Sequence, residues 1–492
     1  MTGENSTRIG RVARGVTWLA GGEAARQVTQ FGIGVVLVRI LQPSDYGLLA
    51  MAAFVIGLLQ VLTKCGVSEA LIQRKHLVED DWSSVYWAQV GLGLVVGVTA
   101  WVLAPLAAGF YREERVIPVV RALSWNALLE ALGGVQLAWL TREMRFRTVA
   151  QVEWAGVLAA GTVGVTMAAT GWGFWSLVGY GLAGPAVTAA LFSATCPWRP
   201  APRLRWASLR SVLRFGLGLQ GFGIVNYFNR RLDDALIGRY VGPVGLGHYS
   251  RAYALMLYPV QNITAVIGRV MFPALSEMGD DLALFRAAYL RAVSTIASVT
   301  FPAMLGLLVT APEVILVVYG PQWMPVVSIL QVLCGVGLLQ SVAASVGWIY
   351  LARGRTDLMF AWSVGAAAVI WSSFIIGLRW GAMGVAIAYA LANGALLVPC
   401  LAIPFRLVGL AVTDLFRAMA GSLAGAVVMA GVTAAVRWSL IGEVSPPAVL
   451  AASATSGIVV YLAWLCVTGA PAMREARLAW SRIAQPRDGV QG

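Results

Sequence analysis

Apolar segments of about twenty residues recur from one end of the chain to the other, and short polar gaps separate them. A helix of that length is long enough to cross a bilayer. Lipid offers no partner to backbone groups, and the segments lack the period-two alternation of a barrel, so the spans are predicted to be helices. Windows of about nineteen residues predict about fourteen of them. They lie at residues 15–39, 47–69, 85–108, 118–140, 149–170, 173–193, 212–238, 250–270, 292–311, 326–351, 358–378, 381–404, 418–437 and 448–468.

Composition agrees with an all-α integral membrane protein. The 492 residues are 59% hydrophobic and only 12% charged, and the polar gaps leave no room for a soluble domain. The five cysteines are scattered without a CxxC spacing, and only two histidines are present. A disulfide framework, a metal site and a resident cofactor are therefore not expected, and no catalytic residue is predicted.

Basic residues predict the orientation of the chain. Most of the arginines in the predicted loops fall on the side that carries the amino terminus, and an even number of spans places both termini on that side. The positive-inside rule then places both termini in the cytoplasm. The first apolar segment follows Arg8, Arg11 and Arg14, lacks a small-residue cleavage site and contains Glu23 and Arg26, so we interpret it as a retained span rather than a signal peptide.

Two short segments suggest an internal repeat. "RILQPSDYG" at 39–47 and "RYVGPVGLG" at 239–247 share arginine, proline and glycine at the same offsets, 200 residues apart. An even number of predicted spans starts between them, so the two halves are predicted to run in the same direction through the membrane.

Polar stripes on two predicted helices coincide under this repeat. Positions i, i+3, i+4, i+7 and i+8 of a helix share one face. On the first helix that face carries Glu23, Arg26, Gln27 and Gln30, and on the seventh helix, within "NYFNRRLDDALIG", it carries Asn226, Arg230, Asp233 and Asp234. Two repeat-related helices are therefore predicted to turn polar faces toward a shared, hydrated cavity.

Energetics favour a cavity over lipid for these charges, because a charged side chain at the centre of a spanning helix costs about 2.5 to 3.5 kcal/mol on insertion scales. Another interpretation stays open: Arg230 and Arg231 lie three or four residues before Asp233 and Asp234, so the cluster can neutralise itself without a ligand.

Asn126 and Glu130 form an i, i+4 pair on the fourth predicted helix. They are expected either to join the cavity wall or to make ordinary interhelical hydrogen bonds. Residues 404–419 and 474–487 mix arginine with large apolar residues, which is typical of helices lying on cytoplasmic headgroups.

At these residues the chain resembles a known family. "LVRILQPSDYGLLAMAAFVIGLLQVLTKCGVSEALIQRK" and "DDALIGRYVGPVGLGHYSRAYALMLYPVQNITAVIGRVMFPALS" are similar to bacterial polysaccharide exporters of the Wzx type, within the multidrug/oligosaccharidyl-lipid/polysaccharide exporter superfamily. The resemblance implies two parallel six-helix lobes around a central cavity, plus two carboxy-terminal helices. The predicted organisation is an N-lobe at 1–200, a C-lobe at 201–405, and an interfacial segment, two helices and a basic cytoplasmic tail at 406–492.

The resemblance also implies a function: moving undecaprenyl-pyrophosphate-linked sugar repeat units from the cytoplasmic to the periplasmic leaflet of the bacterial inner membrane by alternating access. Other polysaccharide assembly proteins are possible partners, and no nucleic acid is expected. A guanidinium can bind phosphate oxygens bidentately. The expected substrate-binding residues are Arg26, Arg230, Arg231, Gln27, Gln30, Asn126 and Asn226. The candidates for ion coupling are Glu23, Glu130, Asp233 and Asp234.

Two other functions stay open at this point. An ion-coupled drug or small-cation antiporter of the same superfamily is expected to have a net acidic cavity with an intramembrane carboxylate. A membrane-bound sugar polymerase or glycosyltransferase needs acid/base or metal-binding groups, usually on sizeable loops, and the predicted loops carry no convincing set.

Overall fold

The computed structural model describes residues 22–23, 25–63, 79–202, 227–279 and 281–468, and within these ranges it is helical without any β-strand. Packing divides the chain into two compact units, residues 1–247 and 248–492. The predicted lobe boundary at residue 200 stays a prediction. In the described ranges, eleven helices or helix pairs are long and apolar enough to span a membrane, and the expected number of about fourteen stays untested.

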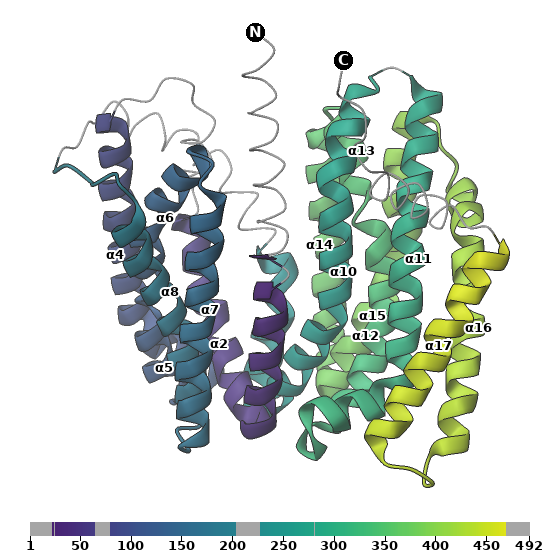
Figure 1. Cartoon of the computed structure of the whole chain (residues 1–492), viewed down its shortest axis with the longest axis horizontal. Coiled ribbons are helices and arrows are strands. Elements are labelled where there is room, and N and C mark those ends of the chain that lie inside the picture. The colour runs from purple at the N-terminus through teal and green to yellow at the C-terminus, as the bar shows by residue number, and fades with distance from the viewer. Residues whose placement is uncertain (1–21, 24, 64–78, 203–226, 280, 469–492) are drawn as a thin grey trace, which may run out of the picture. The chain divides into compact units, whose positions relative to one another are not determined.

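The first unit is a helical bundle (Figure 1). Residues 22–40 are helical, residue 24 aside, and so are residues 227–240. The other helices of this unit are α2 (Pro43–Thr63), α4 (Glu79–Tyr111), α5 (Val116–Leu123), α6 (Asn126–Arg142), α7 (Phe146–Ala169) and α8 (Trp175–Thr195). Within the bundle α7 packs along α8, and α6 packs on both α4 and α8.

The second unit contains most of α10 (Pro243–Glu277), which begins in the first unit. It continues with α11 (Leu282–Val314), the π-helical turn η1 (Ile315–Tyr319), the 3₁₀ turn η2 (Pro321–Trp323), α12 (Val326–Ala343), α13 (Val346–Ala352), α14 (Thr356–Gly377), the 3₁₀ turn η3 (Leu378–Trp380), α15 (Gly381–Val408), α16 (Val412–Leu440) and α17 (Pro446–Thr468). Helix α16 packs on α11 and α17, and α15 packs on α12 and α14.

Local sequence sets the ends of these helices. Helix α2 begins at Pro43, which has no N–H to leave unpaired, and the Asp45 carboxylate accepts a hydrogen bond of 3.0 Å from the Gln42 N–H. Helix α15 ends before Gly409, whose φ of 63° is the left-handed conformation that suits glycine. Residues 404–419, predicted to lie on the headgroups, form the end of α15, a short break and the first turns of α16.

Large apolar side chains cover the outside of the bundles. Leu106 on α4 is 70% exposed and Val459 on α17 is 65% exposed, with many similar residues along the other helices. Soluble proteins rarely expose so much apolar surface, whereas lipid solvates it. The chain is therefore a multi-pass membrane protein.

Candidate functional site

The first helix lies along α7 through close contacts between small and large side chains. A Cβ added to Gly161 on α7 would overlap the side chain of Ile33, so glycine is required for this approach. The indole N–H of Trp154 donates to the Thr29 hydroxyl at 3.4 Å. These contacts hold the polar stripe of the first helix beside α7.

Arg26 on that stripe makes a bidentate ion pair with Glu23. Its Nε lies 2.9 Å from Oε2 and its Nη2 lies 2.7 Å from Oε1 of Glu23, and the Gln27 amide donates to the same Oε1 at 2.8 Å. The Arg26 side chain remains 32% exposed and that of Glu23 40% exposed. The pair is therefore formed but still accessible.

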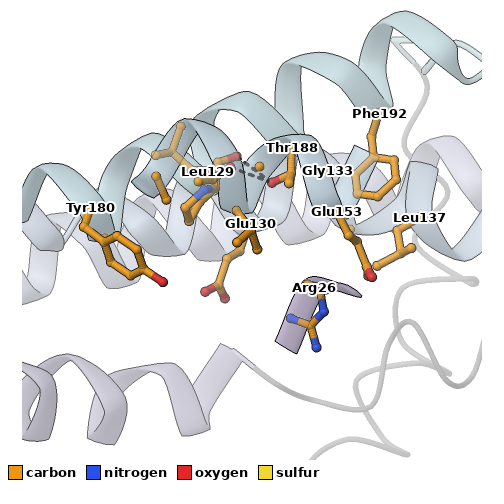
Figure 2. Close-up of a pocket in the computed structure, with 16 residues that line it drawn as sticks. Arg26, Leu129, Glu130, Gly133, Leu137, Glu153, Tyr180, Thr188 and Phe192 are labelled. Carbon is orange, nitrogen blue, oxygen red and sulfur yellow. Dashed lines mark hydrogen bonds between the residues drawn. The ribbon is translucent and has the colours of Figure 1, made fainter. Parts of the chain in front are cut away.

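Arg26 borders a cavity of about 430 Å³ inside the first unit. Figure 2 shows Glu130 from α6, Glu153 from α7 and Tyr180 from α8 pointing toward the short helical segment that carries Arg26. The remaining wall consists of Leu129, Gly133, Gly134, Leu137, Gly156, Val157, Ala160, Gly181, Gly184, Pro185, Thr188 and Phe192.

The cavity exists because α7 and α8 present small residues to each other. A Cβ at Gly156 would overlap Thr188, and one at Gly164 would lie 3.0 Å from the Cβ of Tyr180. Pro185 also interrupts α8, since it has no N–H for the carbonyl of Gly181 four residues earlier, and both residues line the cavity. The glycines on α7 and α8 have no side chains to fill the space between these helices, and a cavity lined partly by polar groups remains there.

The ionisable groups around this cavity are mainly acidic. Among the described residues, Arg26 is the one guanidinium that lines the cavity, whereas the carboxylates of Glu130 and Glu153 line it and Glu23 is paired with Arg26. Arg26 interacts electrostatically with Glu153. Tyr180 shares a hydrogen bond with Gln30, which brings a third residue of the stripe to the cavity.

Asn126 and Glu130, predicted as a pair, occupy different environments. Glu130 lines the cavity, whereas Asn126 begins α6 just after a break at Ser124 and Trp125. The Oδ1 atom of Asn126 is buried and has no hydrogen-bond partner among the described residues. Of the two, the structure brings Glu130 to the cavity of Arg26.

The second predicted stripe lies on the helix of residues 227–240, which packs on α2. The Tyr227 hydroxyl donates to the Phe54 carbonyl at 2.6 Å, and Phe54 contacts the rings of Tyr227 and Phe228 at centroid distances of 5.7 and 6.1 Å. A Cβ at Gly57 would overlap Tyr227. Asn226, the first residue of the predicted stripe, lies outside the described residues.

The four charges of this helix do not behave alike. Asp233 and Asp234 are 4% and 6% exposed, and Arg231 donates to the Asp234 carboxylate at 2.9 Å. Arg230 is exposed, and no residue of the described ranges forms an ion pair with it. Within the described residues, the local pairing that the sequence suggested therefore involves Arg231 and not Arg230.

Comparison with known proteins places this architecture in a family. Residues 36–328, more than half of the chain, match the family model described as polysaccharide biosynthesis protein. The chain belongs to the polysaccharide biosynthesis protein family. It is 31% identical over 380 residues to the lipopolysaccharide biosynthesis protein WzxC of Escherichia coli K12, covering 75% of this chain and 76% of WzxC. It is 28% identical over 315 residues to the succinoglycan biosynthesis transport protein ExoT of Rhizobium meliloti, covering 63% of each chain.

Solved structures share the fold of this family member. The lipid II flippase MurJ in an inward closed conformation superposes with a TM-score of 0.74 at 15% identity, over 92% of this chain and 98% of MurJ. A multidrug resistance MATE family transporter in an inward-facing conformation reaches 0.59 at 15% identity, over 77% of this chain and 94% of the transporter. At these identities the likeness establishes the transporter fold alone.

Sequence reasoning missed Glu153 and Tyr180 in this family member. Both lie inside predicted spans, and an ionisable residue within a span is a functional candidate in its own right. That rule alone would have found Glu153. Tyr180 carried no such signal, because tyrosines are common at the ends of spans.

Proposed function

We propose that this chain is a flippase for lipid-linked oligosaccharides, moving undecaprenyl-pyrophosphate-linked repeat units from the cytoplasmic to the periplasmic leaflet for surface polysaccharide assembly. The family and the similarity to WzxC and ExoT support the pathway, and the MurJ-like fold supports a lipid-linked substrate. The observation that carries the proposal is the cavity among spanning helices that holds Arg26. The chain acts as a transporter rather than an enzyme in this proposal.

Arg26 and Arg230 bind the pyrophosphate. Arg26 already holds a carboxylate bidentately in Glu23, and phosphate oxygens fit the same fork of N–H donors. Binding therefore exchanges Glu23 for phosphate. Arg230 supplies a second guanidinium, which forms no ion pair with another described residue, whereas the Arg231 charge is offset by Asp234.

Amide side chains meet the sugar hydroxyls. Gln27 and Gln30 flank Arg26 on the first helix, and Asn126 and Asn226 complete the proposed set. Their neutral donors and acceptors suit hydroxyl groups without adding charge to the cavity.

The acidic groups couple binding to a proton or another cation. An anionic pyrophosphate beside ionised Glu130 and Glu153 is repelled, so its entry requires that their charge be neutralised. Glu23, released from Arg26, contributes a further carboxylate. Asp233 and Asp234 are proposed for the same role near Arg230.

The protein resides in the bacterial inner membrane with both termini in the cytoplasm. The excess of arginines in the loops on the amino-terminal side supports this orientation. The proposed partners are the lipid-linked oligosaccharide, membrane lipids and other polysaccharide assembly proteins.

Charge reversal tests the capture of the pyrophosphate. Arg26→Glu and Arg230→Glu are expected to lower export at least about tenfold, because each adds repulsion where an anion binds. The measurement is mass spectrometry of lipid-linked sugars in a deletion strain that expresses each variant, where untransported units accumulate. Arg417→Glu, at a side chain that is 83% exposed on α16, is the matched control and should export normally. Undiminished export by well-expressed Arg26→Glu and Arg230→Glu variants would reject this role.

A second candidate function is an ion-coupled antiporter of drugs or small cations. The excess of carboxylates around the cavity favours it, because a cationic ligand is attracted by Glu130 and Glu153. The same strains distinguish the two functions: resistance to cationic dyes with normal lipid-linked sugars supports the antiporter, and accumulated lipid-linked sugars support the flippase.

A further inference from the structure

Arg121 on α5 is a charged residue within a membrane span that the proposed transport mechanism does not use. It belongs to the candidate span Val116–Arg142. A rise of about 1.5 Å per residue puts its Cα about 9 Å along α5 from Arg115 in the α4–α5 turn. That depth is close to the border between headgroups and hydrocarbon, where an arginine without a partner is costly. The charge of Arg121 therefore needs a partner.

The α4–α5 turn lies at the water interface and does not supply that partner. Arg115 donates to both carboxylate oxygens of Glu113, at 2.8 and 2.9 Å, and thereby holds the pKa of Glu113 below its usual value. Both groups are charged at neutral pH, as expected for a turn in contact with water. Within the part of the chain that the structure describes, no carboxylate forms an ion pair with Arg121.

The contact that Arg121 does make is with the indole of Trp101 on α4. Its Cζ atom lies 4.3 Å from the centroid of the Trp101 ring. Its Nε atom is buried and has no hydrogen-bond partner among the described residues. An aromatic ring attracts a guanidinium through its quadrupole and leaves the fork of N–H donors for another group. Trp101 therefore positions the cation without neutralising it.

Close packing of α4 on α5 brings the two side chains together. A Cβ added to Gly97, one turn before Trp101, would lie 3.0 Å from the Ser124 carbonyl oxygen, so a small residue allows this approach. The Ser124 hydroxyl donates to the Arg121 carbonyl at 2.8 Å and thereby ties the end of α5 to its preceding turn. The pair is thus held by backbone packing.

The pair lies on the outside of the helix bundle. Trp101 is 44% exposed, its neighbours Val98 and Val102 on α4 are exposed as well, and Arg121 is half-buried. The described residues that line the Arg26 cavity come from the first helix, α6, α7 and α8, and not from α4 or α5. The guanidinium on Trp101 is therefore a separate site that borders lipid.

We propose that Arg121 and Trp101 bind the phosphate of an anionic phospholipid, with phosphatidylglycerol as the type, in the leaflet that meets the α4–α5 turn. The guanidinium donates to the phosphate oxygens, and the indole holds the guanidinium at the depth of the headgroups. The site goes beyond the proposed transport function and does not depend on the molecule that is carried.

Charge and position select this class of lipid. A phosphodiester with a neutral glycerol headgroup compensates the single positive charge of Arg121. The ammonium of a zwitterionic headgroup would instead find no free carboxylate in the neighbouring Glu113, which is bound to Arg115. On the lipid-facing side of a bundle, phospholipids are also the abundant carriers of phosphate, and basic sites between spanning helices suit anionic headgroups.

Native mass spectrometry of the purified full-length protein tests the site. The apparent Kd of the first bound phosphatidylglycerol is expected to be at least about fivefold below that of phosphatidylcholine, and Arg121→Gln should raise it about tenfold. Arg121→Lys should fall between the two, because an ammonium keeps the charge but not the bidentate fork. Arg379→Gln is the matched control, since Arg379 is an exposed arginine in the turn between α14 and α15, and it should bind as the unmodified protein does. Unchanged binding of phosphatidylglycerol by folded Arg121→Gln would overturn the site.

Substitution of Trp101 tests the role of the ring and stays informative if Arg121→Gln does not fold. Trp101→Leu is expected to raise the apparent Kd for phosphatidylglycerol about threefold, whereas Trp101→Phe should raise it less because a ring remains beneath the guanidinium. Equal affinities of the unmodified protein and Trp101→Leu would contradict the proposed site.

Competition distinguishes the sources of phosphate. Neither undecaprenyl phosphate nor millimolar inorganic phosphate should displace phosphatidylglycerol from the unmodified protein. Displacement by undecaprenyl phosphate at equal concentration would assign the site to the carrier lipid, and displacement by inorganic phosphate would assign it to a free anion. Either result would overturn the phospholipid assignment. None of these measurements involves transport, so their outcome leaves the proposed flippase function untouched.

Discussion

Glu153 is the residue that most changes the chemistry expected around Arg26. It lies on α7, lines the cavity and interacts electrostatically with the guanidinium. With Glu130 it gives the described part of the cavity wall more carboxylates than guanidiniums, even though Arg26 is suited to bind phosphate. Substrate entry and proton or cation uptake are therefore linked in the proposed mechanism.

Removing the Glu153 charge should alter the pH dependence of export. Glu153→Gln is expected to raise export at pH 8 by about threefold relative to the unmodified protein, with little change at pH 6, because it removes repulsion that is greatest when the carboxylates are ionised. The change in pH dependence is measured as the uptake of lipid-linked oligosaccharide by proteoliposomes at both pH values.

Asp357→Asn is the control for that experiment, because the Asp357 side chain is 63% exposed and pairs with Arg355 outside the cavity. Its pH profile should match that of the unmodified protein. An equal loss of export at both pH values in Glu153→Gln would contradict the repulsion argument and assign Glu153 to an obligatory proton transfer.

Individual side chains were predictable where both partners lie on one helix. Glu23 and Arg26 are three residues apart, so the predicted stripe already placed them on one helix face within reach of each other. The choice between Arg230 and Arg231 was not predictable, because both lie within about one turn of the two aspartates and helical spacing does not distinguish them. Glu153 and Tyr180 come from helices far along the chain, and no pattern local to Arg26 points to them.

At the scale of elements, the contact between the first helix and α7 positions the site. Gly161→Val should lower the free energy of unfolding by about 1–3 kcal/mol, because the new side chain overlaps Ile33 and displaces the first helix from α7. A lower melting temperature of the detergent-solubilised protein measures this loss.

Gly34→Val provides the comparison for that substitution, since a Cβ at Gly34 meets nothing within 4 Å. It carries the same helix-propensity cost without the overlap. Equal melting temperatures for the two variants would show that the contact between Ile33 and Gly161 does not stabilise the fold.

Hydropathy predicted where the described helices lie but not their ends or interruptions. Helix α4 runs from Glu79 to Tyr111, beyond the predicted 85–108, because helices continue past the apolar core into the headgroup region. The breaks at Ser124–Trp125 and at Ala344–Ser345 went unpredicted, since neither contains the glycine or proline that marks a turn in a sequence.

On the scale of the whole molecule, the proposed orientation makes a direct prediction. A green fluorescent protein fused after residue 492 is expected to fluoresce, and an alkaline phosphatase fused at the same place should be inactive, because both termini are proposed to lie in the cytoplasm. A non-fluorescent green fluorescent protein fusion together with an active alkaline phosphatase fusion would place the carboxy terminus in the periplasm and contradict the proposed orientation.

Fusions in the turn at residues 112–115 calibrate that experiment. This turn lies at the other face in the proposed topology, so alkaline phosphatase fused there should be active. If alkaline phosphatase gave the same activity at both fusion sites, the turn and the carboxy terminus would lie on the same side of the membrane. That result would contradict the predicted odd number of spans between them.

The repeat motif shows what the sequence could and could not establish about the whole chain. The shared arginine, proline and glycine indicated two related halves, but nothing in one copy says that it touches the other. In the structure the contact is reciprocal: a Cβ added to Gly47 would overlap the backbone of Pro243, and a Cβ added to Gly247 would overlap that of Pro43. The division of the structure after Gly247 places both copies in one unit.

The reciprocity of this contact also bears on ancestry. When residue i of one copy meets residue j of the other and j meets i in return, the interface is isologous, the kind that joins identical subunits about a two-fold axis. A protein of half the length with a single proline–glycine motif would form the same contact with a second molecule of itself. Gene fusion of such a homodimer yields a chain in which each copy can then diverge, as Asp45 and Gly245 at matching positions already have.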